Sequence, residues 1–107
     1  MTASSRSFDL VSYLHRQKRW SSTTFGADKR TVGITKHIAK ELDEIRLAPL
    51  DVTEWIDVVI LALDGAWRAG HSPEQICRAL ADKQDVNMAR KWPKPQSEDE
   101  ATEHIKE

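Results

Sequence analysis

The chain has 107 residues, with 16 Lys and Arg against 17 Asp and Glu and a formal net charge of −1. This length allows one compact domain, not two with separate cores, and the balanced charge provides no overall basic surface for a nucleic acid. The single cysteine, Cys77, excludes an intrachain disulfide and fits a reducing compartment. Because no apolar run approaches the roughly 20 residues of a membrane span, we expect a cytoplasmic protein that binds neither membranes nor nucleic acid.

The first predicted helix is short. Asp9 is placed to cap it, and its apolar residues end at about Arg19. Residues 20–33 are rich in Ser, Thr and Gly without a sustained period, which predicts a long loop. Trp20 in that loop is a candidate for stacking on a nucleobase, and Gln17 is a candidate base contact. The alternative for both side chains is ordinary packing.

The second and third predicted helices are joined by a short turn that contains Pro49. Residues 31–47 carry an apolar stripe at helical spacing, formed by Ile34, Ile38, Leu42 and Ile45. Asp51 is placed to cap a third helix that continues through Ala69. Its apolar residues surround most of its circumference, so we expect it at the centre of the fold or in a subunit interface.

The fourth predicted helix opens at Ser72-Pro73-Glu74-Gln75, which supplies an N-cap, a proline at the first helical position and a capping-box partner. It runs to about Lys91. Residues 94–107 are acidic and polar with little to bury, which predicts a disordered tail. The sequence therefore predicts an all-α fold of about four helices, with one domain over residues 1–93.

Two pairs of carboxylates flank the turn at Pro49, each with i, i+3 spacing: Glu41 with Glu44, and Glu54 with Asp57. Glu41 borders the core side of its helix, whereas Asp43 lies opposite on the solvent side. If the turn folds the two helices antiparallel, the two pairs face each other. Four carboxylates in one place repel, and a hard divalent cation such as Mg²⁺ or Mn²⁺, which prefers oxygen ligands, compensates them.

Each pair also has a simpler explanation. Asp51-Val-Thr-Glu54 resembles a capping box, in which Glu54 ties down the start of its helix. Glu44 is placed to form an ordinary surface ion pair with Lys40 at i, i+4.

On the last helix, the stripe that begins at Ile76 and Leu80 continues as Lys83, Asn87 and Arg90. Polar residues that extend a core-facing stripe predict a charged cavity suited to a polyphosphate. The alternative is a helix end that leaves the core with Lys and Arg side chains reaching for solvent.

With these residues identified, the chain resembles the MazG-like all-α nucleoside triphosphate pyrophosphohydrolases, whose pattern is ExxE followed by ExxD. Here the two motifs are Glu41-Leu-Asp-Glu44 and Glu54-Trp-Ile-Asp57. Within that superfamily it is similar to the dATP/dGTP diphosphohydrolase branch of MazZ-type phage enzymes, over stretches that occur in the same order: TTFG, HIAKELDEI, EWIDVVILALDGAWRAG and KQDVNMARKWP.

The resemblance implies hydrolysis between the α- and β-phosphates that depends on Mg²⁺ or Mn²⁺ and releases a nucleoside monophosphate and pyrophosphate. It implies that Glu41, Glu44, Glu54 and Asp57 hold the metal, and that Glu41 or Glu44 orients the attacking water. Lys83, Asn87 and Arg90 would contact phosphate or sugar, with Arg30 as a weaker addition. Members of this family are dimers or tetramers, which implies a homo-oligomer.

The expected substrate is a purine deoxynucleoside triphosphate, with dGTP preferred over dATP. An enzyme of this kind would supply dGMP in a phage that replaces adenine with 2-aminoadenine. One alternative keeps the mechanism but acts on dUTP or damaged nucleotides. Another is a non-catalytic helical binding module that uses the basic cluster HRQKR at residues 15–19.

Overall fold

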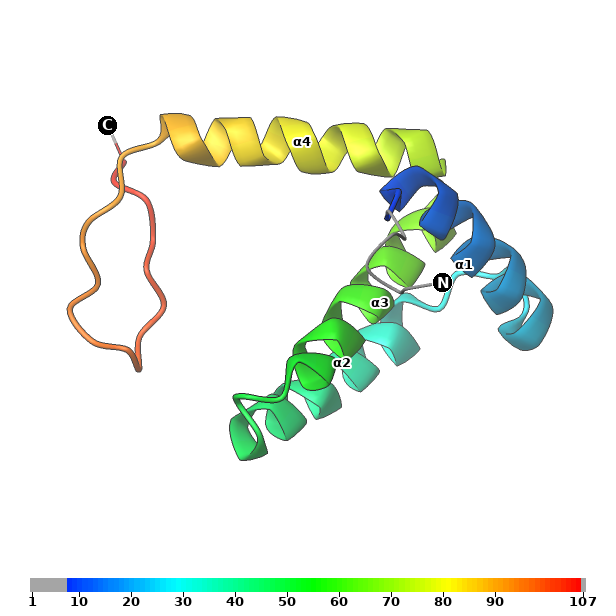
Figure 1. Ribbon diagram of the computed structural model, residues 1–107, viewed down its shortest axis with the longest axis horizontal. Helices are drawn as coiled ribbons and strands as arrows, with labels where there is room; N and C mark the ends of the chain where they lie inside the picture. Colours follow the sequence, from blue (N-terminus) through cyan, green and yellow to red (C-terminus); the bar gives the residue numbers. More distant parts are fainter. Residues whose placement is uncertain (1–7, 107) are drawn as a thin grey trace, which may run out of the picture. The chain divides into compact units, whose positions relative to one another are not determined.

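The computed structural model describes residues 8–106. These residues contain no strand and form four helices (Figure 1): α1 (Leu10–Phe25), α2 (Thr31–Leu47), α3 (Val52–Arg68) and α4 (Pro73–Ala89). The predicted all-α class is therefore confirmed. The chain divides into two compact units, the first ending at Cys77 and the second beginning at Arg78, so that the division falls within α4.

Helix α1 is longer than the sequence predicts. The Asp9 carboxylate caps it by accepting a hydrogen bond from the Val11 backbone N–H at 3.2 Å, as expected. The helix then continues past Arg19 to Phe25 and ends at Gly26, whose φ of +84° favours glycine. The predicted loop over residues 20–33 is therefore wrong, because only residues 26–30 connect α1 to α2.

Helices α2 and α3 form an antiparallel hairpin (Figure 1). The backbone N–H of Ala48 donates to the Glu44 carbonyl at 3.0 Å, and the N–H of Asp51 donates to the Ala48 carbonyl at 3.1 Å, which reverses the chain. Ile34 and Ile45 of the predicted stripe are buried. The predicted bounds of both helices are confirmed to within a residue or two, as is the reversal between them.

The core of the first unit lies where α1, α3 and the first turn of α4 meet. Its buried members are Leu14, Trp67 and Ile76. The capping box at the start of α4 is present, because the Ser72 N–H donates to Gln75 Oε1 at 2.8 Å and the Gln75 N–H donates to Ser72 Oγ at 3.1 Å. This start holds the first turn of α4 against the core.

One face of α3 remains open although the helix packs on both α1 and α2. Trp55, Ile56 and Val59 are each about half exposed. The expectation that α3 is central thus holds for one face only, and burial of the other face in a subunit interface stays a prediction. None of the helices in residues 8–106 is long and apolar enough to cross a membrane.

The second unit contains the rest of α4 and the segment that follows it. Residues 90–106 form no helix or strand. Two contacts join the ends of this segment: the Ile105 N–H donates to the Lys91 carbonyl at 2.7 Å, and the rings of Trp92 and His104 meet at 5.7 Å.

Candidate functional site

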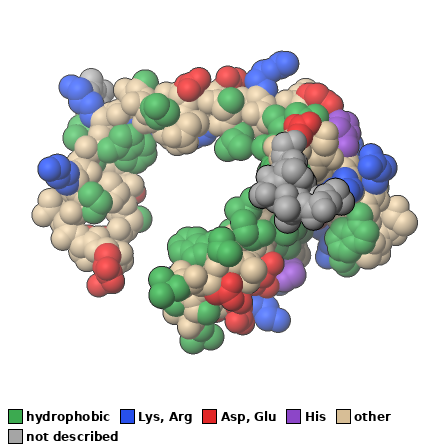
Figure 2. Space-filling model, in the orientation of Figure 1, with side chains coloured by type: hydrophobic (Ala, Val, Ile, Leu, Met, Phe, Trp, Pro, Cys, Tyr) green, Lys and Arg blue, Asp and Glu red, His purple; other side chains and the backbone are tan. Residues whose placement is uncertain are grey.

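Three carboxylates meet on the α2–α3 hairpin. Glu41 comes from α2, and Glu54 and Asp57 come from the first two turns of α3; one carboxylate oxygen of each lies within 4.8 Å of the others. Figure 2 shows acidic side chains gathered over the α2–α3 pair, in the lower part of the view. The reversal at residues 48–51 creates this acid cluster, because it brings the end of one helix beside the start of the next.

Glu44, the fourth predicted metal ligand, lies outside the group of three. Its side chain is exposed, yet its negative charge is one of those that raise the pKa of Glu54. Glu44 is therefore close enough to act electrostatically on the acid cluster, while the other three acids provide the converging oxygens.

The pKa of Glu54 is raised above its usual value of 4.5, first by removal of the carboxylate from water and then by the negative charges around it. The contributing charges are those of Asp51, Asp57, Glu44 and Glu41. In the part of the chain that the structure describes, no Lys or Arg forms an ion pair with Glu54 or Asp57. A divalent cation with oxygen ligands fits this uncompensated charge.

The capping-box explanation for Glu54 is not supported. The carboxylate of Asp51 accepts hydrogen bonds from the N–H and the hydroxyl of Thr53, at 3.0 and 2.7 Å, and these bonds lower the pKa of Asp51. The N–H of Asp51, which a capping box would give to Glu54, donates instead to Ala48. The start of α3 is thus capped without the Glu54 side chain.

The two faces of α2 differ as the helical periodicity predicts. The Glu41 side chain is 16% exposed and pairs with His37 Nε2 at 3.2 Å. The Asp43 side chain is 74% exposed and forms an ordinary surface ion pair with Arg46 at 3.0 Å. His37 holds one Glu41 oxygen, which restricts the orientation of that carboxylate.

A pocket of about 440 Å³ extends from the acid cluster toward α1. Glu41 and Asp57 line it together with Gln17, Trp20 and Arg30, so three predicted base- or phosphate-binding residues share a pocket with two predicted metal ligands. Phe25 also lines it; its ring meets the edge of Trp20 at 5.6 Å, and the Arg30 guanidinium lies 5.2 Å over its face. The wall of the pocket thus changes from carboxylates to aromatic rings and a cation.

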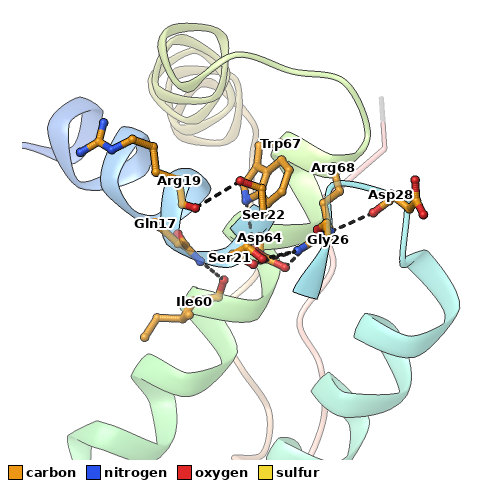
Figure 3. Close-up of polar contacts among 10 residues, drawn as sticks. All are labelled: Gln17, Arg19, Ser21, Ser22, Gly26, Asp28, Ile60, Asp64, Trp67 and Arg68. Carbon is orange, nitrogen blue, oxygen red and sulfur yellow. Dashed lines mark hydrogen bonds and ion pairs between the residues drawn. The ribbon is translucent and has the colours of Figure 1, made fainter. Parts of the chain in front are cut away.

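Gln17 is buried in the wall of this pocket. Its Nε2 donates to the Ile60 carbonyl at 2.9 Å (Figure 3). Since a carbonyl can only accept, this contact fixes which way the amide faces. Its Oε1 is buried and has no hydrogen-bond partner among the described residues, so Gln17 keeps an acceptor.

A buried polar network lies behind the pocket, and the sequence reasoning missed it. Arg68 Nε donates to Asp64 Oδ2 at 2.8 Å, and its other nitrogens reach Ser21 and the carbonyls of Gly26 and Asp28 (Figure 3). The available signal was two charges at i, i+4 on a helix otherwise rich in apolar residues. That spacing fits a surface pair equally well, so only the packing identifies the network.

The predicted phosphate-binding residues of the last helix belong to the second unit. Lys83 is exposed, whereas Asn87 and Arg90 are half-buried, and Arg90 Nη1 donates to Asn87 Oδ1 at 3.3 Å. The expectation that their stripe faces the core is wrong from Leu80 onward, since that side chain is 56% exposed. Within α4, the core includes Ile76, and Cys77 packs against it.

Comparisons with known proteins relate the chain to a phage protein and to one enzyme family. The chain is 43% identical over 88 residues to the Eaa protein of Salmonella phage P22, an alignment that covers 82% of this chain and 27% of that protein. The chain thus spans about a quarter of the length of this curated relative. No solved structure matches the chain significantly. The family model for dATP/dGTP pyrophosphohydrolases matches residues 13–107, a range that contains the acid cluster and the residues lining the pocket. The chain therefore belongs to the dATP/dGTP pyrophosphohydrolase family, whose members are hydrolases acting on phosphoric anhydrides.

Proposed function

We propose that this chain hydrolyses purine deoxynucleoside triphosphates between the α- and β-phosphates, releasing a deoxynucleoside monophosphate and pyrophosphate. The observation that carries the proposal is the pocket itself: Glu41 and Asp57 of the acid cluster line the same cavity as Trp20 and Arg30. A nucleotide has a polyanionic end that needs cations and a flat base that stacks on aromatic rings. The two ends of this pocket match those two needs.

The acid cluster would hold Mg²⁺ or Mn²⁺ through Glu41, Glu54 and Asp57, with Glu44 beside them. When bound, such a cation neutralises phosphate charge and makes water a better nucleophile at neutral pH. Glu44 is exposed and outside the group of three, so its carboxylate is free to orient the attacking water and take its proton. Glu41, held by His37, is the second candidate for that role.

The remaining pocket residues would bind the nucleotide. Trp20 and Phe25 offer ring faces and edges to the base, and Arg30 brings a positive charge to the same end. Gln17, which lines the same pocket, is proposed as a base contact. Lys83, Asn87 and Arg90 are proposed to contact phosphate or sugar, as the family resemblance implies.

The resemblance to MazZ-type enzymes supports a narrower proposal for the substrate and the cellular setting. We propose dGTP as the preferred substrate, with dGMP supplied for 2-aminoadenine synthesis in the cytoplasm of a phage-infected host. The relative in phage P22 supports a phage setting. The open face of α3, formed by Trp55, Ile56 and Val59, supports assembly as a homo-oligomer.

The decisive experiment incubates the protein with each dNTP and Mg²⁺ or Mn²⁺ in ¹⁸O-labelled water. We expect dGMP and pyrophosphate from dGTP, with the label in dGMP because water attacks the α-phosphorus. Orthophosphate with a diphosphate as products, or no turnover of any dNTP, would refute the proposed reaction. Faster turnover of dUTP than of purine nucleotides would replace the proposed substrate and keep the mechanism.

A further inference from the structure

Arg68, in the last turn of α3, ties the connection between α1 and α2 to α3. Its side chain is 1% exposed. Nη1 donates to the carbonyls of Gly26 at 2.6 Å and Asp28 at 2.9 Å, and Nη2 donates to Ser21 Oγ at 2.8 Å (Figure 3). Asp64 neutralises the guanidinium through Nε at 2.8 Å. One buried side chain of α3 thus binds both α1 and the backbone of residues 26–30.

The segment that Arg68 binds is flanked in sequence by two residues that line the pocket. Phe25 immediately precedes Gly26, and Arg30 follows Asp28 by two residues; both Phe25 and Arg30 line the pocket. Neither side chain is fixed by burial, since both are exposed. Their positions therefore depend on the backbone of residues 26–30, which Arg68 holds through the carbonyls of Gly26 and Asp28.

We propose that Arg68 is a positioning residue for base recognition, acting through residues 26–30 on Phe25 and Arg30. This role rests on the proposed function, which places the base at that end of the pocket. The planar guanidinium binds Asp64, Ser21 and two carbonyls in fixed directions. A lysine ammonium keeps the charge but cannot reproduce this geometry.

The metal-binding end of the pocket does not depend on the same contacts. Glu41, Glu54 and Asp57 lie on the α2–α3 hairpin, whose turn is closed by its own backbone hydrogen bonds. A change at Arg68 should therefore weaken recognition of the base and leave metal binding intact. If Arg68 only stabilised the fold, its substitution would weaken both base recognition and metal binding.

The test compares Arg68→Lys with the wild-type chain on dGTP and on 2-deoxyribose 5-triphosphate, which lacks the base. We expect the KM for dGTP to rise about 10- to 100-fold, the loss typical of a misplaced binding group, with kcat changed by less than about threefold. The KM for the abasic triphosphate and the affinity for Mn²⁺ should stay within about twofold of wild type.

Two further variants keep the test decisive. Arg46→Lys is the matched control, because Arg46 forms only an exposed pair with Asp43, and it should behave as wild type. Ser21→Ala removes one acceptor and keeps the guanidinium, so it should raise the KM for dGTP by about two- to tenfold. If Arg68→Lys fails to fold, Ser21→Ala carries the test.

Binding of α,β-methylene dGTP and of its abasic counterpart, measured by calorimetry, separates this proposal from the proposed function. Binding without turnover in the wild type would refute the reaction and leave the role of Arg68 to be judged from affinities alone. Equal loss of affinity for both ligands in Arg68→Lys, or no loss for either, would overturn the positioning role.

Discussion

Helix α3 carries acids in two opposite electrostatic situations. Near its end, Asp64 is buried and fully compensated, because Arg68 and the Trp67 indole both donate to it, at 2.8 and 3.0 Å. Near its start, Glu54 and Asp57 meet Glu41 without an ion pair to Lys or Arg in the described chain. The first acid is neutralised within the fold, whereas the others keep an uncompensated negative charge, at which we propose that a divalent cation binds.

The acids of α3 therefore differ in what they serve: Asp64 contributes to stability, whereas the acid cluster is proposed to act in metal binding and turnover. A buried charge that lacks its partner costs several kcal/mol, so the loss of Asp64 or Arg68 alone should destabilise the unit. The acid cluster lies at the surface, where water reduces the repulsion to a level that the fold tolerates. We therefore expect changes at Asp64 to act on folding, and changes in the cluster to act on metal binding and turnover.

The largest effect on stability should come from Asp64→Ala, which leaves the buried Arg68 guanidinium without its counter-ion. We expect a loss of about 3–5 kcal/mol in the free energy of unfolding, measured by urea denaturation without metal. The exposed pair of Asp43 with Arg46 is the matched control, since Asp43→Ala should cost less than about 1 kcal/mol. Similar losses in the two variants would remove the distinction between the buried and exposed pairs.

The largest effect on activity should come from Glu54→Gln. This change keeps the side-chain shape and removes a charge from the acid cluster, so pyrophosphate release should fall by about 10²- to 10³-fold. The metal-free variant should be at least as stable as wild type, because the raised pKa of Glu54 shows that its charge is disfavoured there. Asp43→Asn should retain full turnover; if Glu54→Gln does too, Glu54 is not part of the site.

Metal should stabilise the chain by a smaller amount. At a Mn²⁺ concentration 100 times Kd, binding adds about 2.7 kcal/mol to the free energy of unfolding, which thermal unfolding detects as a higher Tm. The rise should be absent in Asp57→Asn and retained in Asp43→Asn. A rise of equal size in all three proteins would indicate metal binding elsewhere.

The smallest effects concern pH. The raised pKa of Glu54 means that the metal-free fold loses stability as the pH rises from 4.5 through that higher value. The pKa of Glu74 is lowered from 4.5, chiefly by its hydrogen bond with His15 at 2.6 Å. The stability that this ionised carboxylate contributes is therefore lost as the pH falls from 4.5 through the lowered pKa. In stability–pH curves measured without metal, Glu54→Gln should remove the loss of stability at rising pH, and Glu74→Gln should remove the loss at falling pH.

The hairpin and the acids on it were predictable from sequence because the relevant signals are local. The stripe of α2, the cap at Asp51 and the two i, i+3 carboxylate pairs lie within contiguous stretches. The exposure of Glu41 and Asp43 follows the helical period as expected. What local signals did not provide was the different placement of Glu44, which depends on how the two helices are rotated against each other.

The end of α1 was not predictable from hydrophobic periodicity, because its buried positions are polar. Gln17 and Ser21 are buried. Gln17 Nε2 donates to the Ile60 carbonyl and Ser21 Oγ accepts from Arg68, both on α3 and more than 40 residues away. A pattern search that looks for apolar residues on the buried face therefore stops before Phe25. Because the partners of Arg68 are also far away along the chain, no local pattern indicates what it binds.

The short turn at residues 48–51 also bears on the order in which the two ends of the pocket form. The three acids of the cluster lie within 17 residues of chain on one hairpin, so they come together as soon as that hairpin closes. The aromatic end needs α1, whose side-chain hydrogen bonds with α3 join residues 43 and 47 positions apart. Local opening of α1 would therefore release a nucleotide base while the carboxylates stay together, and hydrogen exchange should be faster in α1 than in the hairpin.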